Sequence, residues 1–165
     1  MPDRTREGDG RHALMRFDLP HCIASGFYSG RSPKAPGTAG SLAAALIGAG
    51  LLALAPVLLW PACLAATTAG FWAVPQVATA DEDPGWVVID EFAGQFLAMT
   101  TLGHFTWQGV AAAFVLFRLF DIAKPGPIGC IDRQGGAFGI MADDLFAGAA
   151  AALILLAARH LGYLP

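Results

Sequence analysis

The stretch "SLAAALIGAGLLALAPVLLWPACLAATTAGFWAVPQVATA", residues 41–80, contains no charged side chain. A helix needs about 20 apolar residues to cross the hydrocarbon core of a bilayer, so this stretch is long enough for two crossings. We expect the chain to turn back at Trp60-Pro61, since proline disfavours a continuous helix. The stretch therefore predicts a helical hairpin embedded in a membrane.

The composition of the whole chain also favours a bilayer. Of its 165 residues 55% are hydrophobic and 14% are charged, whereas an ordinary soluble domain has about 25% charged residues. The net charge is −3 and no run of basic residues is present, which argues against nucleic acid as a partner. Cys22, Cys63 and Cys130 are far apart and lack metal-ligand spacing, so we interpret them as small apolar residues in a reducing compartment.

The charged residues fall almost entirely into three blocks, at residues 3–34, 81–91 and 118–144. Residues 92–117 between the last two blocks are uncharged, and we expect them to fold back near "GHFTW", residues 103–107. A chain that crosses twice between blocks returns to the side it left, so all three blocks share one face. The blocks hold nine of the ten lysines and arginines, which predicts that this face is cytoplasmic.

We therefore predict an all-α fold: a compact, membrane-embedded bundle of about five main helices, with polar loops and helix N-termini forming a site on the cytoplasmic face. The fifth apolar segment, residues 145–158, would carry the C-terminus across. Residues 1–20, which lack the apolar core of a signal peptide, are predicted to be a flexible cytoplasmic leader, and residues 21–165 a single domain. The arms of the 92–117 hairpin and the last run are shorter than a full span, and such lengths also suit a soluble helical bundle.

The first polar cluster, residues 24–46, is a glycine- and proline-rich loop that enters a helix. Thr38 or Ser41 is placed to cap that helix, which is the plain structural interpretation. The functional interpretation is a phosphate cradle made by backbone N–H groups at the helix start, by nearby cations and by hydroxyl groups, with glycines in support: Arg31, Ser32, Lys34, Gly37, Thr38, Gly40 and Ser41.

The second cluster contains "VVIDEFAGQF", residues 87–96, which places Asp90 and Glu91 at or just inside a helix start. One acid there would complement the helix dipole, but two exceed what a cap needs. Gly94 lets another backbone or a ligand approach closely.

The third cluster, residues 117–146, places Arg118 and Asp121 three apart, on one helix face. Lys124 precedes the prolines that end that helix, and Arg133 follows in the connection. Asp143 and Asp144 are expected to open the last helix.

These clusters would bring the carboxylates of two helix entrances to one face of the protein, together with Asp121. Carboxylates gathered without enough close cations repel one another, and a hard divalent cation relieves that repulsion. An oxygen-only ligand set favours magnesium over zinc, and magnesium commonly binds carboxylates plus substrate phosphate. We therefore predict a Mg²⁺-assisted phosphate site whose substrate arrives from the bilayer. Its catalytic and metal residues would be Asp90, Glu91, Asp143 and Asp144, and its phosphate-binding cations Arg118, Lys124 and Arg133.

Three motifs in order, "GFYSGRSPKAPGTAGSL", "VVIDEFAGQF" and "FRLFDIAKPGPIGCIDRQGGAFGIMADDLFAG", resemble the phosphatidylglycerophosphatase A family over about residues 26–148. The resemblance implies a multi-pass enzyme of the bacterial inner membrane that needs magnesium. It would convert phosphatidylglycerophosphate to phosphatidylglycerol and inorganic phosphate, in phospholipid synthesis leading to cardiolipin, and we expect no protein partner. The chain departs from the family pattern at Tyr28, where glycine is frequent, and at Gly126, where tryptophan is usual.

Two alternatives use similar residues. A small membrane cation-binding or transport protein could hold its ion with the same acidic cluster, although the charges gather at one face and no inverted repeat is visible. A CDP-alcohol phosphotransferase would need a DGxxAR-type motif, which is missing. Neither CxxxxxR nor DxDxT is present, so a phosphoenzyme has no support from the sequence, and the choice between water and an aspartate as nucleophile stays open.

Overall fold

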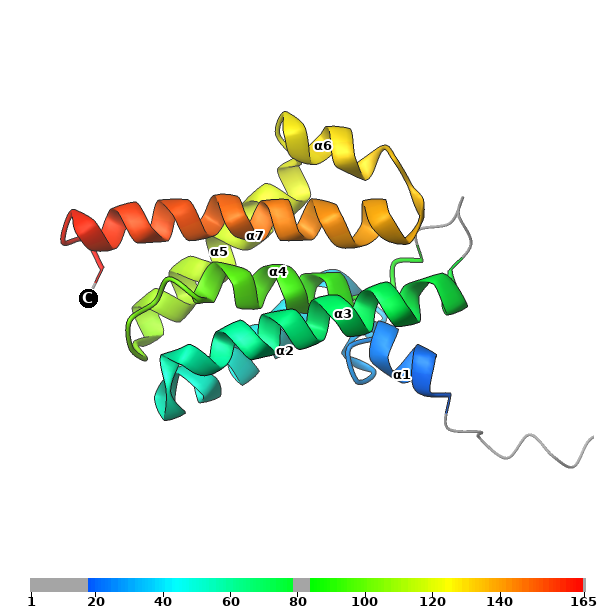
Figure 1. The fold of residues 1–165 in the computed structure, drawn as a ribbon, viewed down its shortest axis with the longest axis horizontal. Coiled ribbons are helices and arrows are strands. Elements are labelled where there is room, and N and C mark those ends of the chain that lie inside the picture. The colour runs from blue at the N-terminus through cyan, green and yellow to red at the C-terminus, as the bar shows by residue number, and fades with distance from the viewer. Residues whose placement is uncertain (1–17, 79–83, 165) are drawn as a thin grey trace, which may run out of the picture.

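The structure is a computed structural model that describes residues 18–78 and 84–164. Residues 1–17 of the predicted leader lie outside the described residues. The described chain folds into seven α-helices and two 3₁₀ turns (Figure 1): α1 Leu19–Ala24, η1 Ser29–Arg31, α2 Pro36–Leu54, η2 Pro56–Leu58, α3 Leu59–Val77, α4 Ile89–Met99, α5 Trp107–Ala123, α6 Pro127–Asp132 and α7 Gly136–His160. The prediction of an all-α bundle with five main helices is confirmed, since α1 and α6 are short.

The first hairpin forms as expected, but its turn lies earlier than Trp60-Pro61. Helix α2 ends at Leu54, Ala55 is extended, and Pro56 opens the η2 turn. A residue before proline avoids the helical region, which explains the break at Ala55. Pro61 lies in the first turn of α3, where its missing N–H has no helical partner to lose, so it does not interrupt the helix.

Among the described residues, three helical stretches are long and apolar enough to cross a membrane: 19 residues in α2, 22 residues from Pro56 to Val77, and 25 residues in α7. The second hairpin turns between α4 and α5 near residues 103–107, as predicted. Helix α4 has only 11 residues, and nine of them are buried. It lies between α7 and the α2–α3 pair (Figure 1), so it is the central helix of the bundle and not a span facing lipid.

The outer faces of the long helices carry large apolar side chains. Leu46 on α2 is 55% exposed, Leu64 on α3 is 65% exposed and Leu153 on α7 is 69% exposed. Exposed apolar surface on this scale marks a membrane or partner interface. Together with the three candidate spans, it is what a helical membrane protein presents to lipid.

Helices α4 and α7 are in backbone contact through two glycines. A Cβ atom on Gly94 would lie 2.5 Å from the carbonyl oxygen of Asp144, and one on Gly148 would overlap the carbonyl group of Gly94. Small residues allow this kind of close approach between membrane helices. The contact places Asp144 beside the start of α4. It also agrees with the expectation that Gly94 lets another backbone approach closely.

The expectation that Asp143 and Asp144 open the last helix is wrong. Helix α7 begins at Gly136, so both acids lie about two turns inside it. The sequence also predicts a glycine-rich turn that extends to Gly139, but that residue is helical and buried. Its missing side chain instead leaves room for the α6–α7 connection, since a Cβ there would lie 3.3 Å from the carbonyl oxygen of Asp132.

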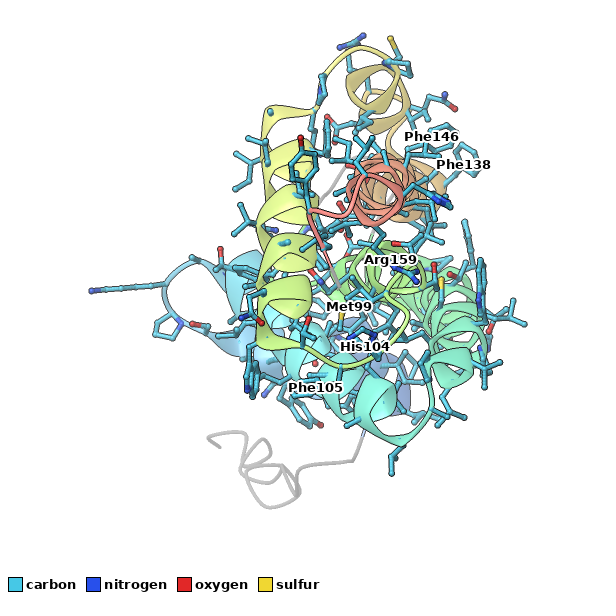
Figure 2. The ribbon with its side chains drawn as sticks, turned by 90° about the vertical axis from the view of Figure 1, so that its left-hand side faces the viewer. Met99, His104, Phe105, Phe138, Phe146 and Arg159 are labelled. Carbon is cyan, nitrogen blue, oxygen red and sulfur yellow. The ribbon has the colours of Figure 1, made fainter. Side chains whose placement is uncertain are left out.

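At its other end α7 is tied to the turn between α4 and α5. Arg159 donates a hydrogen bond to the carbonyl oxygen of Thr101, and Figure 2 shows it directed toward the turn that carries His104 and Phe105. Asp144 lies 15 residues earlier on the same helix, which is about 22 Å along the axis. The acidic residues and this tie therefore occupy different ends of the bundle.

Candidate metal and phosphate site

The first turn of α4 carries two adjacent acids. The helix starts at Ile89, where the backbone N–H of Val88 anchors the entry by donating to the carbonyl oxygen of Ala24 at 2.8 Å. Asp90 and Glu91 follow directly, near the positive end of the helix dipole. Oδ1 of Asp90 accepts a hydrogen bond from the backbone N–H of Glu91 at 3.0 Å, which fixes the first of the two carboxylates.

Asp144 joins them from α7. One carboxylate oxygen from each of Asp90, Glu91 and Asp144 lies within 4.8 Å of the others, and we call this set the three-carboxylate cluster. Glu91 and Asp144 are buried and Asp90 is half-buried. Residues more than 50 positions apart in the sequence are thus close enough to share one ion.

Asp143 belongs to a neighbouring ion-pair network. Its Oδ2 lies 2.6 Å from Nζ of Lys124, and the same ammonium group pairs with Asp132. Lys124 ends α5 in the left-handed conformation, with φ 42°. Its ion pairs with Asp132 on α6 and Asp143 on α7 join the three helices. Asp143 is therefore paired with Lys124 and lies beside the three-carboxylate cluster, not within it.

Arg118 is a positively charged neighbour of the three-carboxylate cluster. Its NH1 group pairs with Asp121 and lies 3.8 Å from Oε1 of Glu91. The other contacts of the guanidinium are with the hydroxyl groups of Ser41 and Thr38 in α2, both at 3.4 Å. Arg118 and Asp121, which the sequence places three apart on one helix face, form an ion pair. The hydroxyl groups of Thr38 and Ser41 contact the arginine, and their role in phosphate binding stays a prediction.

The cluster opens into a cavity of about 270 Å³. Its lining is mostly polar and comes from helices α2, α4, α5 and α7 and the segment before α4: Pro36, Gly37, Gly85, Val87, Asp90, Glu91, Asp121, Lys124, Ile140, Asp143 and Asp144. Gly37 leaves room for the Glu91 carboxylate, because a Cβ on it would lie 2.3 Å from Oε1 of Glu91. Lys124 is the one basic residue in this lining.

The capping role expected of Thr38 or Ser41 is wrong. Helix α2 starts with Pro36 at its first position, and Ala35 precedes it without a side-chain cap. Proline at that position suits a helix start because its fixed φ is already helical. The hydroxyl group of Ser41 donates to the carbonyl oxygen of Gly37 at 2.8 Å, inside the helix, and Gly40 packs against Val88.

Two other predicted phosphate-binding residues are not brought to the cavity. Ser32 donates its hydroxyl to the carbonyl oxygen of Lys34 and lines a separate cavity with Arg31 and Trp86. Arg133 is exposed at the end of α6, where NH2 lies 3.1 Å from Sγ of Cys130.

The acids at the start of α4, which lie outside the three candidate spans, have perturbed proton affinities. Burial, followed by the charge of Asp144, raises the pKa of Glu91 to about 8, against a smaller opposing effect of Arg118. Burial and the charge of Glu91 raise the pKa of Asp90 well above its usual value. For Lys124 burial lowers the pKa, but the bonds to Asp132 and Asp143 outweigh burial, so its pKa is raised and it stays charged.

The cluster fits a hard divalent cation. Oε2 of Glu91 is buried and has no hydrogen-bond partner, so a cation would complete its coordination. All donors in the cluster are carboxylate oxygens, the ligands that magnesium prefers. Within residues 18–78 and 84–164, no histidine or cysteine takes part in such a group, which disfavours zinc.

Two participants were missed from the sequence. Asp132 shares Lys124 with Asp143, and its position after the α5–α6 break gave no signal of that contact. Gln95 is completely buried, and neither of its amide atoms has a partner. Its spacing of four residues from Glu91 in "DEFAGQF" could have flagged it, because such residues are neighbours on a helix.

Fold and site together define a helical membrane-type protein whose polar cavity combines carboxylates with a fixed cation, the combination that metal-assisted phosphoryl transfer requires. The family model for phosphatidylglycerophosphatase A matches residues 22–159. The chain therefore belongs to the phosphatidylglycerophosphatase A family, which makes it a hydrolase of the phosphatase class.

Relatives support the family assignment over most of the chain. Phosphatidylglycerophosphatase A of Escherichia coli is 40% identical over 160 residues, covering 94% of this chain and 92% of the relative. The Haemophilus influenzae protein of the same name is 40% identical over 144 residues, covering 85% and 88%. A Bacteroides thetaiotaomicron protein with the provisional name phosphatidylinositol-3-phosphatase is 41% identical over 150 residues, covering 86% and 94%. No solved structure matches the chain.

Proposed function

We propose that this protein is a Mg²⁺-dependent phosphatidylglycerophosphatase of the bacterial inner membrane. It hydrolyses the terminal phosphomonoester of phosphatidylglycerophosphate at the cytoplasmic face, in the synthesis of phosphatidylglycerol and cardiolipin. The observation that carries the proposal is the convergence of Asp90, Glu91 and Asp144 within 4.8 Å, in a cavity that also holds Lys124. Family membership supplies the lipid phosphate as the substrate class.

In this proposal Asp90, Glu91 and Asp144 hold the cation. Bound there, Mg²⁺ would act as a Lewis acid that polarises the phosphomonoester and favours an activated water. Asp143 acts through Lys124, whose ammonium group it holds at 2.6 Å on the cavity wall. Arg118 holds Glu91 and Asp121 in place through its ion pairs with both residues.

Lys124 serves the reaction as a fixed charge and not as an acid. Because its pKa is raised by two carboxylate partners, it keeps its proton and can donate hydrogen bonds to phosphate oxygens as negative charge develops on them. An attacking water would form the new P–O bond while the bond to the glycerol oxygen breaks. The proton of that water passes to a carboxylate of the cavity and from there to the leaving glycerol oxygen, which gives phosphatidylglycerol.

The test is phosphate release from phosphatidylglycerophosphate by purified protein in detergent, with EDTA and with Mg²⁺ restored. We expect release that EDTA abolishes and Mg²⁺ recovers. Phosphatidylinositol 3-phosphate belongs in the same assay because of the name of the Bacteroides relative, and faster release from it would change the assigned substrate. Cation flux into liposomes without phosphate release would support the transport alternative instead.

A further inference from the structure

Gln95, in the middle of α4, is the most anomalous polar residue of the described chain. It is 0% exposed, and both its amide nitrogen and its amide oxygen lack a hydrogen-bond partner. Buried amides are nearly always paired, because an unpaired one loses its bonds to water without replacement. In the described segments, the remaining buried side-chain atoms without a partner are Oε2 of Glu91 and Nε of Arg118. All of these atoms therefore belong to Gln95 and to two residues of the candidate site.

The position of Gln95 on α4 directs it toward the same part of α2 that Arg118 contacts. Glu91, Gln95 and Met99 are spaced by four residues and share one face of the helix. The two ends of this stripe pack on α2: a Cβ on Gly37 would meet Glu91, and one on Gly48 would lie 2.7 Å from Sδ of Met99. Gln95 lies between those ends.

Arg118 reaches α2 within the same interval. Its NH1 group lies 3.4 Å from Oγ of Ser41, a residue between Gly37 and Gly48 in the sequence. The amide of Gln95 and the guanidinium of Arg118 therefore approach one stretch of α2 from α4 and α5, with Glu91 one helical turn before Gln95.

The unpartnered atoms are chemically complementary. Gln95 offers two N–H donors and a carbonyl acceptor, Arg118 Nε offers one donor, and Glu91 Oε2 accepts. An amide that donates to Glu91 and accepts from Arg118 would satisfy all of them. The structure shows no such direct bond among them, and a buried water commonly completes a network of this kind.

We propose that Gln95 is a positioning residue of the metal site. Its amide links Oε2 of Glu91 to Nε of Arg118 through buried water, and so holds the Glu91 carboxylate in the orientation that cation binding requires. The inference rests on the proposed function only for the identity of the cation. Partners that orient a metal ligand typically contribute 10- to 100-fold to metal affinity.

The test compares Gln95→Leu and Gln95→Met with the wild type and with Gln108→Leu, a matched change at an exposed position of α5. Mg²⁺ affinity is measured by calorimetry and the thermal unfolding of the metal-free protein by its melting temperature. We expect both Gln95 variants to lose roughly 10-fold or more in affinity. Both variants should still unfold in one cooperative thermal transition without metal, which shows that the lost affinity is not a loss of fold, and Gln108→Leu should behave as wild type.

Several outcomes would overturn the proposal. Wild-type Mg²⁺ affinity in both Gln95 variants, an equal loss in Gln108→Leu, or no cation binding by the wild type would each do so. If the two variants fail to fold, an experimental structure of the wild type decides: buried water joining Gln95 to Glu91 and Arg118 is expected, and an empty gap contradicts the proposal. Should the wild type bind Mg²⁺ in a Gln95-dependent way yet release no phosphate, the proposed function fails and the positioning role stands.

Discussion

Replacing Gly148 with alanine tests whether the backbone contact between α4 and α7 sets the geometry of the three-carboxylate cluster. A Cβ on Gly148 would lie 2.9 Å from both Cα and the carbonyl carbon of Gly94. Carbon atoms prefer a separation of about 3.5–4.0 Å, so the two helices must move apart by roughly 0.6–1 Å. Magnesium needs oxygen ligands at about 2.0–2.1 Å in near-octahedral geometry, so Asp144 on α7 would no longer complete a site built on α4.

A displacement of about 1 Å can cost 10²-fold in rate, and overpacking typically destabilises by about 1–3 kcal/mol. We therefore expect Gly148→Ala to fold with a lower melting temperature and to release phosphate roughly 10²-fold more slowly at saturating Mg²⁺. The measurements are phosphate release across a Mg²⁺ titration and thermal unfolding in detergent.

The matched control is Gly50→Ala in α2, where a Cβ would meet nothing within 4 Å. It should leave activity unchanged and raise stability slightly, since alanine is the better helix former. Wild-type turnover and Mg²⁺ affinity in Gly148→Ala would refute the reasoning that this helix contact positions the carboxylates.

Three further predictions concern charge, pH and orientation. Lys124→Met should reduce phosphate release by about 10²-fold or more, as expected for a lost charge contact in the transition state. Its control, Arg133→Met at the exposed end of α6, should have little effect. Equal losses in both variants would contradict the placement of Lys124 in the cavity. The pKa of Glu91 is raised to about 8 in the metal-free protein, so Mg²⁺ must displace a proton from Glu91 below that pH. Calorimetry should therefore show Mg²⁺ affinity that rises with pH until about 8. A flat affinity profile from pH 6 to 8 would count against Glu91 as a ligand. The same raised pKa makes the stability of the metal-free fold depend on pH. The contribution of Glu91 is fully present below its pKa in the unfolded chain, near 4.5, and is lost as the pH rises through about 8. Melting temperatures measured across that pH range would check this. Finally, Cys130 on α6 is exposed whereas Cys22 and Cys63 are buried, so a membrane-impermeant maleimide should label it only after the inner membrane is permeabilised; labelling in intact spheroplasts would reverse the proposed orientation.

The sequence predicted the long helices because their signal is local. In lipid, the backbone N–H and C=O groups of a charge-free run such as residues 41–80 must bond to one another, which a helix achieves. The structure places α2 and α3 in this run. The errors concern where helices begin. Pro61 and Gly139 look like helix breakers, but the first is in the opening turn of α3 and the second faces a close backbone, and neither context is visible in the sequence.

The site was partly predictable for a different reason. Adjacent acids at Asp90-Glu91 and Asp143-Asp144 stand out beside apolar helices, where charge is costly, so their convergence could be anticipated. Which acid faces which cation could not, because the Lys124 pair with Asp143 depends on how α5, α6 and α7 pack. The structure places Ser32 and Arg133 outside the cavity lining, where they contact Lys34 and Cys130, and residue type alone could not indicate that placement.

The central claim is that three carboxylates from two helices share one divalent cation. The most direct test is an experimental structure of the protein crystallised with Mn²⁺ in place of Mg²⁺, with the ion located by its anomalous scattering. A single Mn²⁺ peak in contact with carboxylate oxygens of Asp90, Glu91 and Asp144 is the result we predict. Full Mn²⁺ occupancy at any other position, with these three carboxylates free of metal, would contradict it.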